Sequence, residues 1–384
     1  MARLGDIATV ITKGTTPTSI GFDFQSNGVN FVKIESIDGN GGFICDKFDH
    51  ISDECHEKLR RSQLQENDIL FSIAGAIGRT AIVTKDILPA NTNQALAIIR
   101  IPQGTINYSF LLYILQSSVV FEQAEKKKQG VAQLNLSLKD IGDFIIPDIS
   151  LEQQEIIIQT LDKVNNMISL RKQQLSKLDE LVKSRFVELF GDPETNPYGY
   201  PTKKLSDVAS YWNGLTYKPE DVQDQGTIVL RSSNIQNSQL DFEDTVRVAC
   251  KIREKQYVQN NDILMCSRNG SAKLVGKVAL ITNITEPMSF GAFMMIIRSD
   301  YYRYLMTYFQ MDAFRNQIKT GATTTINQIT GTMLNQVILP VPDLNVVSQF
   351  ATFVEQIDKS KFEIQKSLEK LETLKKALMQ KYFG

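Results

Sequence analysis

The chain has 384 residues, of which 42% are hydrophobic and 22% charged, and its formal net charge is −1. This composition is typical of globular proteins, and the length is too great for one ordinary core, so we expect two domains. All apolar runs are shorter than the ~20 residues that a membrane-spanning helix needs, and the N-terminus lacks a signal-peptide pattern, which predicts a cytoplasmic protein without membrane contact. A net charge near zero neither favours nor excludes nucleic acid, because a basic face can be balanced elsewhere.

Residues 1–150 have the pattern of a mixed α/β domain. Short apolar runs such as DILFSI (68–73) and ALAIIRI (95–101) predict strands, and frequent glycines predict turns between them. A longer apolar run at 108–128 predicts a helix.

From residue 151 the pattern becomes that of one long helix. Ser150 and Gln153 form a predicted capping box, and Phe-Gly-Asp-Pro at 190–193 supplies a glycine stop followed by a proline. We therefore expect a helix over 151–191 with a length of about 60 Å.

The remainder of the chain repeats this order. The string NDIL occurs at 67–70 and again at 261–264, and the segments 89–100 and 287–298 both open on proline and close on Ile-Ile-Arg. Matching segments keep one order, and their offsets drift only slightly, as expected for two diverged copies separated by small loop insertions. The chain is therefore predicted to be an internal duplication.

The duplication divides the chain into four parts. Two globular domains are expected at 1–150 and 192–343, and two long helices at 151–191 and 344–384. The second domain repeats the helix prediction of the first, at 301–319. We expect the α+β class.

Both long helices carry apolar residues at alternating spacings of three and four, which is a heptad seam. The predicted pairing residues are Leu161, Val164, Ile168, Arg171, Leu175, Leu178, Val182, Ile357, Ile364, Ser367, Leu371, Leu374 and Leu378. Antiparallel pairing is expected, since either helix alone would leave its apolar stripe in water; the alternative is that each helix packs along its own domain. In the antiparallel arrangement Arg171 faces Ser367, where it either fixes the register or extends to solvent.

The sequence contains no pattern typical of catalysis or metal binding. It has no P-loop and no glycine fingerprint between a strand and a helix, and NPYGYP at 196–201 is only a faint match to a methyltransferase signature. Cys45, His50, Cys55 and His56 lack the common zinc spacings, and the second copy has no equivalent. We expect neither a metal nor a catalytic residue, and we expect the cysteines to be reduced.

Two dissimilar globular domains, each followed by a similar heptad helix, resemble the specificity subunit of Type I restriction-modification systems. The resemblance covers the whole chain and rests on the segment 151–192, the proline-led entry before it, and NDIL with its following glycine turn. It implies two pseudo-twofold related target-recognition domains, separated by two antiparallel coiled-coil helices. Each domain would recognise one half of a bipartite double-stranded DNA target, and the helices would set the spacer.

The resemblance also implies partners. Two methyltransferase subunits would dock on the helices and domains, and restriction/translocase subunits would join them. S-adenosylmethionine, ATP, magnesium and every catalytic residue would belong to those partners, so this chain would be non-catalytic. The alternative is a coiled-coil adaptor that bridges two protein partners without sequence-specific DNA binding.

Candidate DNA contacts are polar and basic loop residues, because Arg, Lys, Asn and Gln contact base edges while basic and hydroxyl groups contact phosphates. They are Lys13, Thr15, Thr16, Lys33, Arg79, Asn91, Asn93, Gln94, Gln133 and Asn135 in the first copy, and Lys218, Arg231, Ser267, Arg268, Asn269, Lys273, Lys277, Thr323, Thr324 and Thr325 in the second. For each of them, a solvated surface residue is the competing interpretation. The copies differ most in these loops, so we expect an asymmetric target.

Overall fold

The computed structural model describes residues 1–39, 41–127, 135–319 and 327–384. They form two compact units: the first comprises Met1–Lys172 with Lys366–Gly384, and the second comprises Gln173–Gln365. Each unit therefore includes part of both long helices. Every helix within the described residues is too short or too polar to cross a bilayer.

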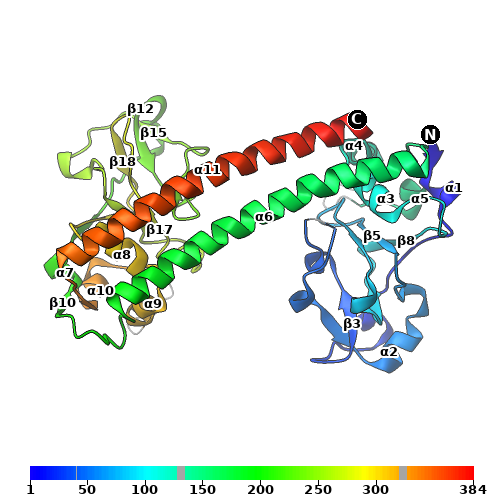
Figure 1. The fold of residues 1–384 in the computed structure, drawn as a ribbon, viewed down its shortest axis with the longest axis horizontal. Coiled ribbons are helices and arrows are strands. Elements are labelled where there is room, and N and C mark those ends of the chain that lie inside the picture. The colour runs from blue at the N-terminus through cyan, green and yellow to red at the C-terminus, as the bar shows by residue number, and fades with distance from the viewer. Residues whose placement is uncertain (40, 128–134, 320–326) are drawn as a thin grey trace. The chain divides into compact units, whose positions relative to one another are not determined.

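The first unit contains a four-stranded sheet, a three-stranded sheet and one further strand pair (Figure 1). The four-stranded sheet has the strand order β2-β8-β5-β6 and the three-stranded sheet β4-β3-β7, in which β3 and β7 run parallel, while β1 pairs with β9. The strands are β1 (Ala2–Arg3), β2 (Val10–Lys13), β3 (Val29–Val32), β4 (Asp49–Ile51), β5 (Ile69–Ser72), β6 (Thr80–Ile82), β7 (Ala90–Thr92), β8 (Leu96–Arg100) and β9 (Ile145–Ile146). The short helices are α1 (Leu4–Ile7), α2 (Asp53–Lys58), α3 (Tyr108–Leu115), α4 (Ser118–Lys127) and α5 (Leu138–Gly142).

The second unit repeats this topology. Its sheets have the orders β11-β19-β16-β17 and β15-β12-β18, with β10 paired to β20 and an added hairpin β13-β14. The strands are β10 (Thr202–Lys204), β11 (Ser210–Asn213), β12 (Val222–Leu230), β13 (Ile235–Gln236), β14 (Gln239–Leu240), β15 (Arg247–Val248), β16 (Ile263–Cys266), β17 (Val278–Leu280), β18 (Met288–Phe290), β19 (Met294–Arg298) and β20 (Ile338–Pro340). The short helices are α7 (Leu205–Val208), α8 (Tyr302–Tyr308), α9 (Asp312–Lys319) and α10 (Gly331–Leu334). The shared strand order is that of a duplicated fold.

The repeated NDIL string has one structural explanation in both units. Asn67 and Asn261 have φ values of 68° and 71°, a left-handed conformation that asparagine tolerates better than most residues. Strand β5 then follows, with Ile69 in one hydrophobic cluster and Leu70 in another, because successive side chains of a strand point to opposite faces. The asparagine of the string therefore forms a turn, and the residues after it begin a strand whose two faces are both buried.

The single helix predicted at 108–128 is wrong: α3 ends at Leu115 and α4 begins at Ser118. The break is at Ser117, whose Oγ accepts a 3.5 Å hydrogen bond from the Val120 N–H and so starts a new helix. The helix predicted at 301–319 is likewise divided into α8 and α9.

The two long helices have the predicted bounds at their starts. Helix α6 (Leu151–Phe190) and helix α11 (Leu344–Phe383) each contain 40 residues. Ser150 Oγ accepts a 3.3 Å hydrogen bond from the Gln153 N–H, and Gln153 Oε1 accepts one of 3.4 Å from the Ser150 N–H, so the predicted capping box is present. Gly191 follows α6 with φ 74°, as expected of a glycine stop.

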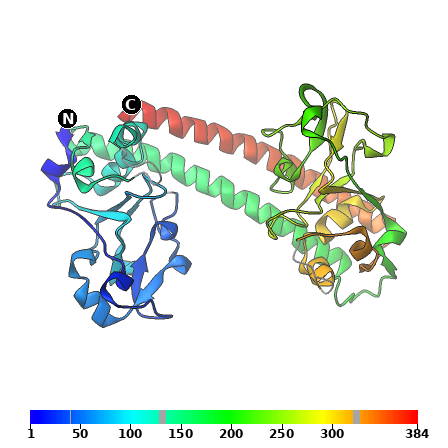
Figure 2. The same cartoon turned by 180° about the vertical axis from the view of Figure 1, so that it is seen from behind.

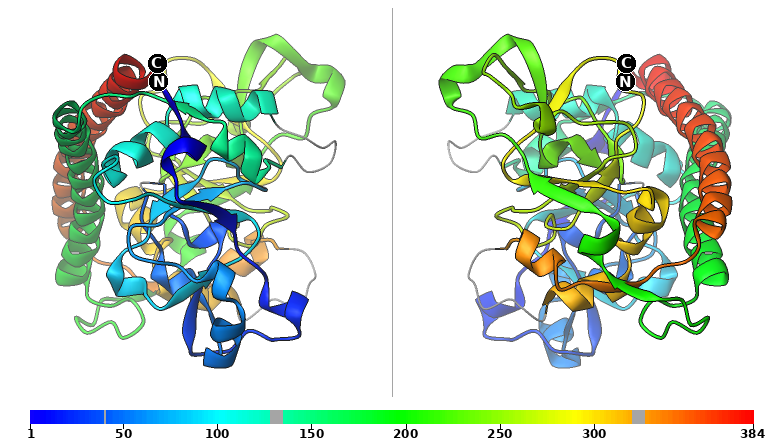
Figure 3. Two further views of the ribbon diagram at one scale, coloured as in Figure 1. Left: turned by 90° about the vertical axis from the view of Figure 1, so that its right-hand side faces the viewer. Right: turned by 90° about the vertical axis from the view of Figure 1, so that its left-hand side faces the viewer.

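Within each unit the two long helices run antiparallel. In the first unit, Leu161 near the start of α6 and Phe383 at the end of α11 belong to one core, so that the two chain ends lie on the same side of this unit (Figures 2 and 3). In the second unit, Phe186 near the end of α6 and Phe350 near the start of α11 share a core and contact each other edge to face. The helices therefore complete the cores of both units.

The predicted seam is buried or half-buried at all but one position. The buried members are Leu161, Val164, Ile168 and Ile357, and the half-buried members are Arg171, Leu175, Leu178, Val182, Ile364, Ser367, Leu371 and Leu378. The prediction is wrong for Leu374, whose side chain is 45% exposed. The alternation of three and four residues from Leu371 brings Lys375 inward instead, and Lys375 is half-buried. The pairing of Arg171 with Ser367 stays a prediction.

Each globular part is joined to a long helix through an equivalent aspartate. In the first unit, Tyr113 Oη donates a 2.5 Å hydrogen bond to Asp162 Oδ1 and accepts one of 2.7 Å from Asn165 Nδ2. In the second unit, Arg303 Nη1 donates a 2.7 Å hydrogen bond to Asp358 Oδ2. Burial, reinforced by the Asp162 carboxylate, raises the pKa of Tyr113, so its hydroxyl remains a donor.

Candidate nucleic-acid interface

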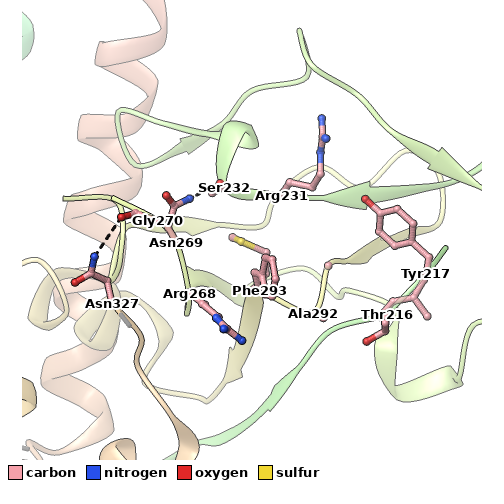
Figure 4. Close-up of a pocket in the computed structure, with 13 residues that line it drawn as sticks. Thr216, Tyr217, Arg231, Ser232, Arg268, Asn269, Gly270, Ala292, Phe293 and Asn327 are labelled. Carbon is pink, nitrogen blue, oxygen red and sulfur yellow. Dashed lines mark hydrogen bonds between the residues drawn. The ribbon is translucent and has the colours of Figure 1, made fainter. Parts of the chain in front are cut away.

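A hollow of about 900 Å³ lies at the strand ends of the second unit. It is lined by Leu215, Thr216, Tyr217, Arg231, Ser232, Arg268, Asn269, Gly270, Gly291, Ala292, Phe293, Met294 and Asn327 (Figure 4). The loop leaving β16 lies against the loop entering β19 because these strands are antiparallel neighbours, with Cys266 opposite Met294. The segments after β11 and β12 join them because β11 pairs with β19 and β12 pairs with β18. We call this the second-unit hollow.

Arg268 and Phe293 are both exposed and lie against each other in this hollow. Phe293 is 59% exposed, and the Arg268 guanidinium carbon lies 5.3 Å from the centre of its ring. The backbone of this pair is fixed, since Ser267 Oγ and the Arg268 N–H donate to the Phe293 carbonyl oxygen at 2.9 and 3.1 Å. An arginine over an aromatic face is held in orientation while its N–H groups stay outward.

Two other polar residues of the second-unit hollow, Asn269 and Arg231, have side-chain hydrogen bonds within the unit. Asn269 Nδ2 donates to Ser232 Oγ at 3.1 Å, and its Oδ1 accepts from the Ser271 N–H at 3.0 Å. Arg231 Nη2 donates to Asp244 Oδ1 at 2.6 Å, while its buried Nε has no partner among the described residues. In Figure 4, Arg231 extends away from the Arg268–Phe293 pair.

Three of the predicted contacts of the second copy therefore lie in one hollow, namely Arg231, Arg268 and Asn269. Others lie outside it: Lys218 pairs with Glu220 at 3.6 Å, Lys273 is exposed and Lys277 is half-buried, both in the turn from β16 to β17. Thr323, Thr324 and Thr325 lie outside the described residues.

The prediction that Ser267 contacts DNA does not fit its position. Its side chain is 3% exposed and is used to bind the Phe293 carbonyl, so it positions the hollow instead of lining its surface. Sequence reasoning missed Tyr217, Phe293 and Asn327. An aromatic residue in the loop directly before β19, where the first copy has Ala95, was the available signal for Phe293.

The first unit has the same strand-end framework with different side chains. Ile73 N–H donates to Ala95 O at 2.9 Å, just as Ser267 N–H donates to Phe293 O at 2.9 Å, so Ala95 occupies the position of Phe293. By the same register Ala74 occupies the position of Arg268. Both Ala74 and Arg268 form an isolated bridge to a following loop, through Asn135 and Gln328 respectively.

Several predicted contacts of the first copy meet at this edge. Thr16 Oγ1 donates to Gln94 Oε1, and Asn93 Oδ1 accepts from the Ala95 N–H at 3.0 Å. Thr15 N–H donates to Thr92 O at 3.1 Å, and Asn135 is exposed beside Ala74. Thr15, Thr16, Asn93, Gln94 and Asn135 thus form a polar surface in place of the arginine and aromatic of the second unit.

The other predicted contacts of the first copy lie elsewhere. Lys13 is exposed at the end of β2, and Lys33 is paired with Asp49 and lies 4.3 Å from the Phe24 ring centre. Arg79 lines a separate hollow of about 640 Å³ with Lys375. Gln133 lies outside the described residues.

The prediction that Asn91 contacts DNA also does not fit the structure. Its side chain has no exposed surface, and it donates to Leu59 O and Ser62 Oγ at 3.1 Å. Its Oδ1 contacts His56 Nδ1. Among the described residues, no group of three or more His, Cys, Asp or Glu side chains is arranged to hold a metal ion.

A family model described as the Type I restriction modification DNA specificity domain matches residues 1–180 and 197–376. The chain belongs to this family. The two matched segments correspond to the two copies of the duplication, so each copy is one DNA specificity domain.

Known members of the family are similar to parts of this specificity-domain chain. It is 28% identical over 196 residues to the StySPI specificity subunit of Salmonella potsdam, which covers 48% of this chain and 42% of that subunit. It is 31% identical over 174 residues to the EcoBI specificity subunit of Escherichia coli, which covers 44% and 36%. The similarity thus spans less than half the length of these relatives.

Two solved structures share the fold over the whole chain. One, from a study of complex assembly and conformational transition of the type I R-M system, has a TM-score of 0.58 at 18% identity and covers 100% of this chain and 96% of that one. The other, the Type I restriction-modification system S subunit from M. genitalium, has a TM-score of 0.54 at 14% identity and covers 100% and 95%. At these identities the likeness is one of fold.

Proposed function

We propose that this chain is the DNA sequence-specificity subunit of a Type I restriction-modification complex. Each unit recognises one half of a bipartite double-stranded DNA target through its strand-end loops, and the two long helices set the unread spacer between the half-sites. The observation that carries the proposal is one framework with different side chains at equivalent positions: Ala74 and Ala95 in the first unit, Arg268 and Phe293 in the second. Because the two surfaces differ, the two half-sites differ.

The chain acts together with partners. Two methyltransferase subunits dock on the helices and globular parts, and restriction/translocase subunits join the complex. S-adenosylmethionine, ATP and magnesium bind to those partners, and the chemistry takes place there. The chain itself selects the DNA sequence at which the partners act. The complex works in the cytoplasm, where the DNA lies.

Methylation mapping tests this proposal. The full chain, produced with its methyltransferase subunits, is expected to direct methylation to one asymmetric bipartite sequence. Replacing residues 1–150 with the corresponding segment of another family member should change one half-site and leave the other unchanged. Methylation without a bipartite consensus, or a change in both halves after the exchange, would contradict the proposal.

A coiled-coil adaptor without DNA recognition is the competing function. The family match disfavours it, since the matched description is that of a DNA specificity domain. A gel shift with duplex DNA in the presence of the methyltransferase subunit separates the two. An adaptor would show no preference for the mapped sequence over a scrambled duplex.

A further inference from the structure

The guanidinium of Arg268 combines restraint with free donors. It lies over the Phe293 ring, and its backbone N–H is bonded to the Phe293 carbonyl. Its side-chain N–H groups have no hydrogen-bond acceptor among the described residues, whereas Arg231 in the same hollow is bound to Asp244. A restrained fork of free donors suits a planar ligand with two adjacent acceptors.

Phe293 contributes a second, apolar feature. Its side chain is 59% exposed at the mouth of the second-unit hollow, directly beside the Arg268 guanidinium, so a ligand of Arg268 would also meet an apolar surface. Ala292 beside it is half-buried, so the surface next to the Arg268 guanidinium is apolar. The second-unit hollow therefore has a bidentate hydrogen-bond donor, Arg268, next to an apolar surface formed by Phe293 and Ala292.

We propose that the second-unit hollow recognises a guanine adjacent to a thymine in the DNA major groove. Arg268 donates to O6 and N7 of the guanine, and the C5 methyl group of the thymine packs on Phe293 and Ala292. These are the pairings that the donor and acceptor pattern of the major groove favours for arginine and for an apolar contact. The proposal rests on the proposed function and names the bases that one unit selects.

Guanine is favoured over phosphate as the ligand of Arg268 for a physical reason. A phosphate contact needs only a cation with freedom to adjust, which the exposed Lys273 of the neighbouring turn provides. Stacking on Phe293 limits that freedom in Arg268 and orients its fork. A phosphate also accepts two hydrogen bonds from an arginine, but it has no apolar group for Phe293 and Ala292, whereas the methyl group of a thymine next to a guanine would contact them.

Base analogues test the proposal with the unaltered protein. The complex is bound to duplexes of its mapped target in which single guanines are replaced by 7-deazaguanine, which lacks N7, and single thymines by deoxyuracil, which lacks the methyl group. We expect one such guanine in the second half-site to lower affinity roughly tenfold or more, and an adjacent thymine to lower it several-fold.

Variants then connect these positions to the two residues. Arg268→Ala should relax methylation at the sensitive guanine by on the order of ten- to hundredfold in discrimination, and Phe293→Ala should relax it several-fold at the adjacent thymine. Arg253→Ala, which removes an exposed arginine of the same unit outside the hollow, is the matched control and should change neither. Thermal unfolding verifies that the variants fold.

Two outcomes overturn the inference in distinguishable ways. If Arg268→Ala weakens all sequences equally and lowers the salt dependence, Arg268 contacts phosphate; the inference is then wrong while the proposed function stands. If the unaltered complex methylates no bipartite sequence, the proposed function fails and the inference fails with it.

Discussion

Arg100 holds the buried carboxylate of Asp68 with two hydrogen bonds of 2.7 Å, one from Nε and one from Nη2. Arg298 holds Asp262 in the same way, at 2.6 and 2.8 Å. The aspartate of the NDIL string therefore binds the arginine that closes the Ile-Ile-Arg segment, in both units. In each unit, the two strings that are most similar between the copies thus supply the two partners of an ion pair with a buried aspartate.

Asp68→Asn should destabilise the chain by about 2–4 kcal/mol, because it removes the charge from a buried bidentate pair and leaves Arg100 partly unpaired. Glu54→Gln, which breaks the exposed Glu54–Lys58 pair, is the control and should cost about 0.5 kcal/mol or less. Urea unfolding measures both. Equal effects of the two substitutions would contradict the role assigned to the buried pair.

Gly14→Ala should unfold or strongly destabilise the first unit. A Cβ atom there would lie 1.9 Å from the Thr92 carbonyl oxygen, so the loop that carries Thr15 and Thr16 would have to move. We expect a loss of at least about 2 kcal/mol in unfolding free energy. Gly39→Ala, where a Cβ meets nothing within 4 Å, is the control in the same unit and should be nearly neutral. A stable Gly14→Ala chain with unchanged methylation would show that the loop tolerates the shift.

Lys375→Leu should stabilise the chain by about 1 kcal/mol, since it replaces a half-buried cation in the helix seam with an apolar residue. Burial, with a contribution from Lys172, lowers the pKa of Lys375 below its ordinary value of 10.5. The charged form is thus disfavoured in the folded state, and this cost disappears as the pH rises towards 10.5.

The stability difference between Lys375→Leu and the unaltered chain should therefore be full near pH 7 and become smaller as the pH approaches 10.5. Melting temperatures across this range measure it. Lys376→Leu, at the exposed neighbouring position, is the control and should show neither gain nor pH dependence. A stability difference between Lys375→Leu and the unaltered chain that increases with pH would contradict a lowered pKa of Lys375.

Thiol reactivity should separate the exposed Cys45 from the buried Cys55 and Cys266. Cys45 is exposed, whereas Cys55 and Cys266 are buried, and burial raises the pKa of both. A raised pKa leaves less of the reactive thiolate at a given pH. At pH 8 a chromogenic disulfide reagent should modify Cys45 quickly, and Cys55 and Cys266 only after denaturation. Rapid modification of Cys266 in the folded chain would show that β16 opens readily.

Shortening both helices by one heptad should shorten only the unread spacer. Deletion of 168–174 together with 364–370 keeps the remaining seam residues in phase and removes about 10 Å of helix, equivalent to about three base pairs. Affinity is expected to fall as well, because one half-site also rotates about the DNA axis.

Methylation mapping of the heptad deletion should then show unchanged half-sites and a shorter spacer. A deletion of four residues from each helix, 168–171 with 364–367, puts the seam out of phase and is expected to destabilise the chain. An unchanged spacer in the heptad deletion would mean that the helices do not set it.

The sequence by itself determined the elements whose signals are local or repeated. The start of α6 followed from Ser150 and Gln153, because a capping box involves only neighbouring residues. The heptad seam followed from spacing, and the duplication followed from matched strings. Together these established an α+β fold with two similar units and two long helices.

Only the tertiary structure decided which polar residues reach a common surface. Arg268 and Phe293 are 25 positions apart and meet because β16 and β19 are neighbouring strands, while Asn91 and Ser267 turn inward to satisfy backbone groups. In the helix seam, Lys375 is half-buried and Leu374 is exposed. The packing of the two helices, and not hydrophobicity alone, determines which side chains of α11 are buried. A side chain's exposure depends on residues distant in the chain, and no local pattern carries that information.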